Sequence, residues 1–189
     1  MLLDFLGGYM GTVAFTGYRP NKLPFAEDKK DELYLAFRKR LRQVIDRLVE
    51  RGYTEYVSGV AMGFDTWVAE DVIEVRKNNP NIRLECAIPC PNQDKNWSFW
   101  DKVRRKKILH RADSKPVICE HYNDQCFHIR NRYMVDKADV VVCCYDGQKG
   151  GTGYTVNYAL KADKIVVQIK IKSIQIVLHG TCESCSDNL

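Results

Sequence analysis

Two glycine-rich segments carry the residues of this chain best suited to bind an anion. The first reads Ser-Gly-Val-Ala-Met-Gly-Phe-Asp at residues 58–65, between a β-like run and a helical one. The second reads Gly-Gly-Thr-Gly at residues 150–153, after the apolar run at 140–145. Small residues let backbone N–H groups at a helix start turn toward a phosphate, with the positive end of the helix dipole behind them. Glycines also let a helix pack closely on a strand, but two such turns together favour a nucleotide-binding site.

A third turn, Thr-Gly-Tyr-Arg-Pro at residues 16–20, follows a predicted strand at 12–15. Its glycine permits close approach of a ligand, and its arginine offers a fork of N–H donors to an oxyanion. A second arginine, at position 130, is expected to neutralise phosphate as well. Gly151 is expected to have a positive φ, which a β-branched residue adopts only at a cost. The predicted ligand-binding residues are Gly17, Arg19, Ser58, Gly59, Ala61, Gly63, Arg130, Asn131, Gly150, Gly151 and Thr152.

Alternating strand and helix patterns position these turns. Further strands are predicted at 55–57, 82–88, 116–119, 139–145 and 164–169, and helices at 31–51, from 64 to 78, around 97–111, at 130–137 and at 155–162. This alternation predicts an α/β fold: a single Rossmann-like, doubly wound, mainly parallel sheet with helices on both faces. In such sheets ligands bind beyond the carboxyl ends of the strands, where the three turns lie. No Gly-x-Gly-x-x-Gly follows the first strand, so the dinucleotide fingerprint is absent.

The predicted helix around 97–111 carries three aromatic residues and a basic run. For Trp97, Phe99 and Trp100 we favour packing in the core over base stacking. In the run 102–111 six of ten residues are Lys or Arg. We favour a solvated helix face for these charges, because Val103, Ile108 and Leu109 already form an inward stripe.

Length and composition indicate one globular domain. The chain has 189 residues, of which 45% are hydrophobic and 28% charged. We divide it into an N-terminal extension (1–11), a nucleotide-binding domain (12–170) and a C-terminal tail of unassigned role (171–189). The net charge of +5 favours anionic partners without the bias of a dedicated nucleic-acid module.

The same composition argues against several sites and locations. No apolar run has the roughly 20 residues of a membrane helix, and no secretory signal is recognised, so we expect a cytoplasmic protein without a membrane partner. The eight cysteines are expected to stay reduced. Cys182 and Cys185 have metal-like spacing but lack a second pair to complete a zinc site, so no metal is predicted.

Five ordered motifs between about residues 12 and 169 resemble the YpsA-like family of the SLOG superfamily. They are the turns at 16–20 and 58–65, Pro-Cys-x-x-Gln at 89–93, Arg-Asn-x-Tyr-Met-Val at 130–135, and Asp-Gly at 146–147 with Gly-Gly-Thr at 150–152. The resemblance implies a Rossmann-like sheet related to DprA and to the LOG phosphoribohydrolases. It also implies a role in binding nucleotides or nucleotide-derived ligands, and a tendency to form homodimers.

One departure from the LOG pattern bears on catalysis. LOG proteins carry a catalytic Glu after their Gly-Gly-x-Gly-Thr segment, whereas Thr155 stands at that place here. Whether the chain is an enzyme therefore stays open, and Asp65 and Asp146 are the candidates to replace the missing carboxylate.

Three functions remain in consideration. The preferred one is binding of a mononucleotide or an ADP-ribose- or NAD-like ligand by a sensor or regulator, with no certain cofactor. The alternatives are a LOG-type N-glycoside hydrolase of nucleoside monophosphates and, with less support, a DprA-like binder of single-stranded nucleic acid that uses the basic helix.

Overall fold

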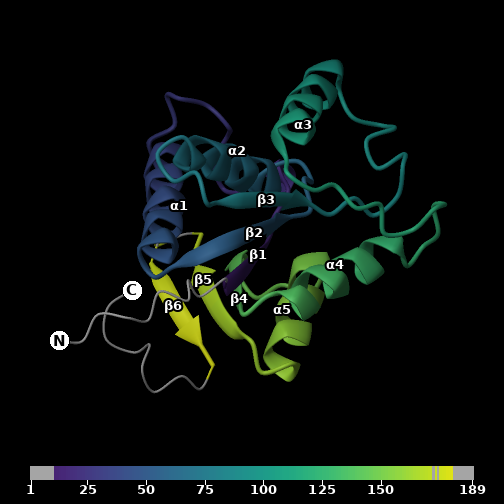
Figure 1. The fold of residues 1–189 in the computed structure, drawn as a ribbon. Helices are drawn as coiled ribbons and strands as arrows, with labels where there is room; N and C mark the ends of the chain where they lie inside the picture. The colour runs from purple at the N-terminus through teal and green to yellow at the C-terminus, as the bar shows by residue number, and fades with distance from the viewer. Residues whose placement is uncertain (1–10, 172, 174, 181–189) are drawn as a thin grey trace.

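The computed structural model describes residues 11–171, 173 and 175–180. A six-stranded sheet runs through its centre in the order β3-β2-β1-β4-β5-β6 (Figure 1). The strands are β1 (Gly11–Gly17), β2 (Tyr53–Ser58), β3 (Arg83–Cys86), β4 (Val140–Cys144), β5 (Ile165–Ile169) and β6 (Ile176–His179). All neighbouring pairs are parallel except β5 and β6. The predicted α/β, mainly parallel architecture is confirmed.

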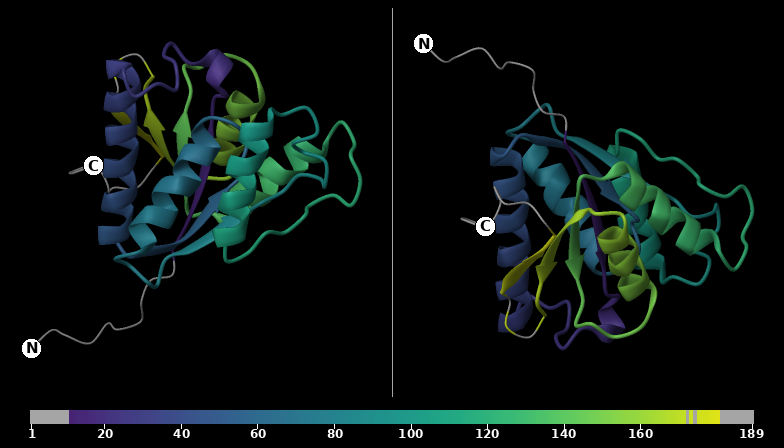
Figure 2. Two further views of the ribbon diagram at one scale, coloured as in Figure 1. Left: turned by 90° about the horizontal axis from the view of Figure 1, so that it is seen from above. Right: turned by 90° about the horizontal axis from the view of Figure 1, so that it is seen from below.

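Helices cover both faces of the sheet. They are α1 (Glu32–Glu50), α2 (Phe64–Arg76), α3 (Phe99–Arg111), α4 (Cys126–Lys137) and α5 (Gly151–Lys161), with a short 3-10 helix η1 (Pro20–Lys22) after β1. Helices α1 and α2 lie on one face with α3 beside α2, and α4 and α5 lie on the other (Figures 1 and 2).

The alternation of side chains along the central strands builds a core on each face. In β1, Val13 and Phe15 pack toward α1 and α2, whereas Ala14 packs toward α4 and α5. In β4, Val142 belongs to the first core and Val141 to the second. Strands buried on both faces read as continuous apolar runs, which explains why the sequence pattern located them.

The direction in which the sheet grows reverses at its centre. From β1 the chain adds β2 and then β3 on one side, and it returns to add β4 and β5 on the other. The carboxyl ends of β1 and β4 are adjacent, with Gly17 opposite Cys144 and the Tyr18 N–H donating to the Cys144 carbonyl at 3.1 Å. This is the switch point at which doubly wound sheets place ligands.

Two segments differ from the sequence prediction. Residues 116–119 form no strand; Val117 makes only an isolated parallel bridge to Ile88. Pro116 has no N–H to donate, so it contributes only its carbonyl to the Ile88 N–H. At the other edge, β6 adds an antiparallel strand within the segment to which the sequence assigned no role.

Some predictions fall on residues whose structure is not described. Residues 1–10 of the predicted extension and the Cys182/Cys185 pair lie outside the described residues. Within the described part of the chain, no helix has the length and apolar character needed to cross a membrane.

Candidate functional site

A cavity of about 400 Å³ opens at the switch point. Its walls come from the turn after β1, the start of α2, one face of α4 and the start of α5. Nine of the predicted site residues line it: Gly17, Arg19, Ala61, Asp65, Arg130, Asn131, Gly150, Gly151 and Thr152. Ser58, Gly59, Gly63 and Asp146 are not among the lining residues. The structure thus brings together three loops that are far apart in the sequence.

The second glycine-rich turn is the open wall of this cavity. Gly150 precedes α5 with φ 153° and ψ −173°, a region that essentially only glycine occupies. The predicted positive φ at Gly151 is wrong, since that conformation belongs to Gly150. A Cβ on Gly151 would meet no atom within 4 Å. The Thr152 hydroxyl donates to the Gly17 carbonyl at 3.1 Å, which fixes the start of α5 to the end of β1.

The start of α5 has the properties of an anion site. The first N–H groups of a helix have no acceptor within the helix. Within the described part of the chain, no other acceptor is found for the N–H groups of Gly151 and Thr152. These donors, together with the positive end of the helix dipole, favour a phosphate or carboxylate at this wall.

Two exposed cations also face this cavity. Arg19 and Lys22 both line the cavity from the turn after β1. The Lys22 ammonium lies 3.4 Å from the point where a Cβ on Gly150 would stand, and 5.5 Å from the centre of the Tyr18 ring. The sequence reasoning missed Lys22. Its position three residues after Arg19, in the same turn, was the available signal.

The first glycine-rich turn is closed by protein groups. The Ser58 hydroxyl donates to the Asp65 carbonyl at 2.8 Å and accepts from the Val60 N–H at 3.1 Å. The Phe64 N–H donates to the Tyr18 carbonyl at 3.4 Å. A Cβ on Gly63 would stand 2.9 Å from that same carbonyl. Gly63 is therefore required by the close approach of the β1 turn.

The Gly59 carbonyl is the centre of a buried clamp. It accepts from Arg130 Nη1 at 2.6 Å and from Gln93 Nε2 at 3.1 Å. Arg130 Nη1 also reaches the Ala87 carbonyl at 3.3 Å. A Cβ on Gly59 would overlap the Arg130 guanidinium. Three of the motifs that carry the family resemblance, at 58–65, 89–93 and 130–135, therefore meet at one carbonyl oxygen.

Arg130 is consequently a buried structural residue that also borders the cavity. Its exposed fraction is 5%. Burial lowers the pKa of its guanidinium, and the nearby Asp65 carboxylate opposes this shift. Its Nε has no hydrogen-bond partner within the described part of the chain.

Asp65 is the carboxylate of this cavity. Burial raises its pKa to about 6, against the opposing effects of Arg130, the Ala61 N–H and Arg19. A carboxyl group with this pKa changes its charge near neutral pH, which is the property expected of a general acid or base.

Thr155, which stands where the LOG pattern has its Glu, lines the cavity and uses its hydroxyl in two hydrogen bonds. It accepts from Asn131 Nδ2 at 2.8 Å and donates to the Gly151 carbonyl at 2.8 Å. Its exposed fraction is 2%. Asn131 and Thr155 therefore join α4 to the first turn of α5, and Thr155 supplies no group for acid–base chemistry.

Asp146 lies outside the cavity. Its carboxylate accepts a short hydrogen bond from the Tyr18 hydroxyl and one from the Gln148 N–H at 3.2 Å. Burial and the hydrogen bond to Asp146 raise the pKa of Tyr18 to about 12. These contacts position the turn after β4.

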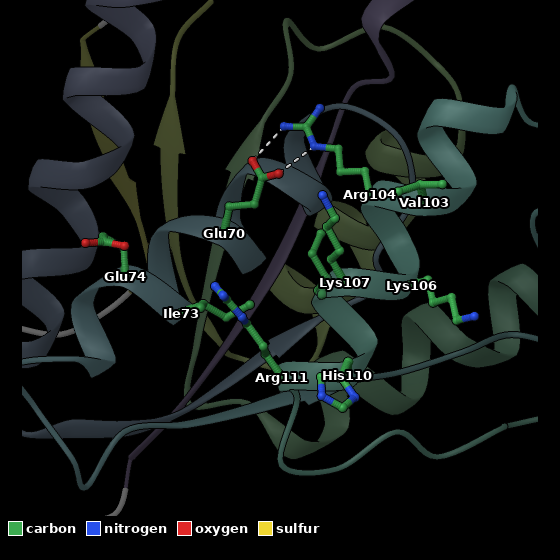
Figure 3. A pocket seen from close by; sticks show the side chains of 10 residues that line it. Glu70, Ile73, Glu74, Val103, Arg104, Lys106, Lys107, His110 and Arg111 are labelled. Carbon is green, nitrogen blue, oxygen red and sulfur yellow. Dashed lines mark hydrogen bonds and ion pairs between the residues drawn. The ribbon is translucent and has the colours of Figure 1, made fainter.

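A separate groove of about 880 Å³ lies between α2 and α3. Figure 3 shows Glu70 and Ile73 of α2 facing Arg104, Lys107 and Arg111 of α3, whereas Lys106 points away from α2. Arg104 forms a bidentate ion pair with Glu70: its Nε and Nη2 each donate to one carboxylate oxygen at 2.6 Å.

The basic and aromatic residues of α3 differ from the sequence prediction. Arg105 is 7% exposed and contacts Asp94 and Gln93 at 3.1 and 3.2 Å. The run is thus not uniformly a solvated face. Phe99 and Trp100 are 69% and 75% exposed, so core packing is wrong for both. Within the described residues, no three His, Cys, Asp or Glu side chains gather in a way that could hold a metal ion.

Sequence comparison finds related proteins in Bacillus species. UPF0398 proteins of Bacillus thuringiensis (strain Al Hakam) and Bacillus cereus (strain AH187) are each 26% identical over 159 residues, which cover 82% of this chain and 86% of theirs.

Two solved DprA structures share the fold. DNA processing protein A from Helicobacter pylori, described for its single-stranded DNA binding mode, has a TM-score of 0.56 at 18% identity. DprA from Streptococcus pneumoniae has a TM-score of 0.57 at 21% identity. Both matches cover 84% of this chain but only 65% and 50% of the respective DprA chains.

The family comparison extends over most of the chain. The family model for YpsA, which is described as the YspA SLOG family, matches residues 13–177. This span runs from β1 into β6 and includes every wall of the cavity. The chain therefore belongs to the YpsA family of SLOG proteins.

Proposed function

We propose that this protein binds a nucleotide or a nucleotide-derived ligand in the cavity at the switch point, as a sensor or regulator. One observation carries the proposal: the N–H groups at the start of α5 have no protein acceptor within the described residues, and Lys22 and Arg19 line the same cavity. This combination of helix N-terminus and cations is suited to phosphate. Membership of the SLOG family and the fold shared with DprA support a role in binding nucleotides or nucleic acid.

The test is a thermal-shift screen of AMP, ADP-ribose and NAD, followed by calorimetric titration of the best ligand. Arg19→Ala and Lys22→Ala should each weaken binding about tenfold to hundredfold, because each removes a charge-assisted hydrogen bond of about 1.5–3 kcal/mol. Lys106→Ala is the matched control, since it removes an equally exposed cation far from the cavity. Equal affinities for all three variants and the parent would disprove the site.

A second candidate function is hydrolysis of the N-glycosidic bond of a nucleoside monophosphate. The observation that favours it is Asp65, a buried carboxylate that lines the cavity and has a pKa of about 6. In this reaction Asp65 takes a proton from the attacking water while the C–O bond forms and the C–N bond breaks. The proton then passes to the departing nitrogen, so the base leaves neutral and the carboxylate is restored. Incubation with AMP and chromatography for adenine test it: Asp65→Asn should abolish release, while Asp146→Asn should not.

Nucleic-acid binding through α3 has narrower support. The exposed residues suited to it are Lys106, Lys107, Phe99 and Trp100, because Arg104 and Arg105 are engaged by carboxylates. Affinity for a single-stranded oligonucleotide should then fall steeply with salt and be lost on Lys106→Glu with Lys107→Glu. A flat salt response would exclude this surface.

A further inference from the structure

We propose that the α4 wall of the cavity binds an aromatic base, with Phe127 as the residue that selects for it. The inference rests on the proposed nucleotide-binding function and defines the ligand class more narrowly. Four residues of α4 line the cavity: Phe127, Arg130, Asn131 and Met134. Their spacing of three, four and seven places them on one face of the helix.

The two ends of this face are apolar. Phe127 and Met134 flank Arg130 and Asn131. Arg130 Nη1 is engaged in the clamp and Asn131 Nδ2 in the link to Thr155, while Arg130 Nε has no partner within the described residues.

The start of α5 lines the same cavity beside this face, because Asn131 of α4 donates to Thr155 of α5 at 2.8 Å. Lys22 lies next to Gly150 at the start of α5. The cavity therefore combines helix-start N–H donors and a lysine with an aromatic ring, which suits a ligand that has a phosphate at one end and a flat apolar group at the other.

Phe127 lacks the packing that explains the buried rings of this protein. Phe25, Phe37 and Trp67 contact one another in the core below α1 and α2. Phe127 is half-buried, and within the described part of the chain its ring contacts no other aromatic ring. A phenyl ring at a cavity wall offers a face for stacking, and every nucleobase has a complementary face.

The inference excludes two ligand types that would satisfy the phosphate wall equally well. A sugar phosphate or an inorganic polyphosphate would leave Phe127 uncovered. A mononucleotide would use both walls, and the cavity of about 400 Å³ lies within the usual range for such sites.

The experiment compares two probes that differ only by the base, AMP and ribose 5-phosphate, by calorimetric titration of the full chain. The parent should bind AMP at least tenfold more tightly. Phe127→Ala should weaken AMP binding on the order of tenfold, the effect of losing one stacked ring, and leave ribose 5-phosphate within twofold. Phe127→Tyr should restore AMP affinity, and Phe127→Leu should restore part of it. Phe99→Ala is the matched control, because it removes an exposed ring outside the cavity.

The outcomes separate this inference from the proposed function. Two results would contradict base binding by Phe127 and leave the phosphate site unaffected. One is equal affinity of the parent for the two probes, and the other is unchanged AMP affinity in a folded Phe127→Ala protein. Equal losses for both probes show that Phe127 acts only on the fold and also contradict base binding. If the parent binds neither probe, the proposed function fails and the inference falls with it. Circular dichroism of each variant establishes that it is folded.

Discussion

The two glycine-rich turns look alike in sequence but differ in what their backbone groups contact. The turn after β2 is closed: Ser58 accepts from the Val60 N–H, Tyr18 accepts from the Phe64 N–H, and Arg130 and Gln93 bind the Gly59 carbonyl. The turn after β4 is open at Gly151, where nothing lies within 4 Å of a Cβ, although a Cβ on Gly153 would stand 2.9 Å from the Gln148 carbonyl. A glycine can thus be required by a neighbouring side chain or leave room for a ligand. Only the three-dimensional contacts tell these cases apart.

The two turns therefore have different roles, one in stability and the other in ligand binding. The closed turn joins β2, the loop after β3 and α4 into one unit, and this unit holds Asp65 at the cavity wall. The open turn presents donors to whatever enters the cavity. Substitutions in the closed turn should therefore change stability, and substitutions in the open turn should change binding.

The largest expected effect is that of Arg130→Ala. It removes the donor to the Gly59 and Ala87 carbonyls and leaves the buried Asp65 carboxylate without its nearby cation. Each hydrogen bond from a charged donor contributes about 1.5–3 kcal/mol, and this variant loses two of them. Urea unfolding should show this loss, and the exposed Arg19→Ala should change the free energy of unfolding by less than about 0.5 kcal/mol. Equal stability of the two variants would mean that the clamp does not hold the closed turn.

The sequence predicted Arg130 as a phosphate ligand, whereas the structure places it at the cavity border with its guanidinium bound to two carbonyls. Parallel strands end at a common edge, so the loops after β1 and β4 could be brought together on pattern alone. The path of the Arg130 side chain could not be predicted from the pattern, because it depends on the space left by Gly59 and on the position of two carbonyls. The same limit applies to Phe99 and Trp100. Which turn of an amphipathic helix reaches the core depends on where α3 packs against α2, and that information is absent from the periodicity.

A pH dependence is the second expected effect, and it depends on Asp65. Its pKa rises from 3.8 to about 6 on folding, so the folded state binds the proton more tightly than the unfolded state. Stability from this group is fully present below about pH 4 and is lost as pH rises through 6, by about 3 kcal/mol at most at 1.36 kcal/mol per unit. Unfolding measured from pH 4 to pH 7 should show this decline in the parent and not in Asp65→Asn. A decline of the same size in both proteins would assign it to another group.

A smaller loss is expected for Gly59→Ala. The added methyl overlaps the Arg130 guanidinium, so the arginine must shift and weaken its bond to the Gly59 carbonyl. Overpacking in a dense interior costs about 1–3 kcal/mol. Chemical denaturation measures it, and the double variant with Arg130→Ala should show that the two losses are not additive, because both act on one contact. Fully additive losses would show that Gly59 and Arg130 act independently.

The smallest expected effect on stability, and the sharpest test of the contrast, is Gly151→Ala. Its methyl meets no atom within 4 Å, and φ at Gly151 is not positive, so the change should alter the free energy of unfolding by less than about 0.5 kcal/mol. The bulkier Gly151→Val should also fold, because the space beside Gly151 is open. In calorimetric titration with AMP, however, Gly151→Val should abolish binding, since its side chain fills the space in which the N–H groups of α5 meet the phosphate. Gly59→Ala should show the reverse: a clear loss of stability, and a smaller loss of AMP affinity than in Gly151→Val. If Gly151→Val binds AMP as tightly as the parent, the phosphate does not bind at the open turn. The distinction between the two turns would then be wrong.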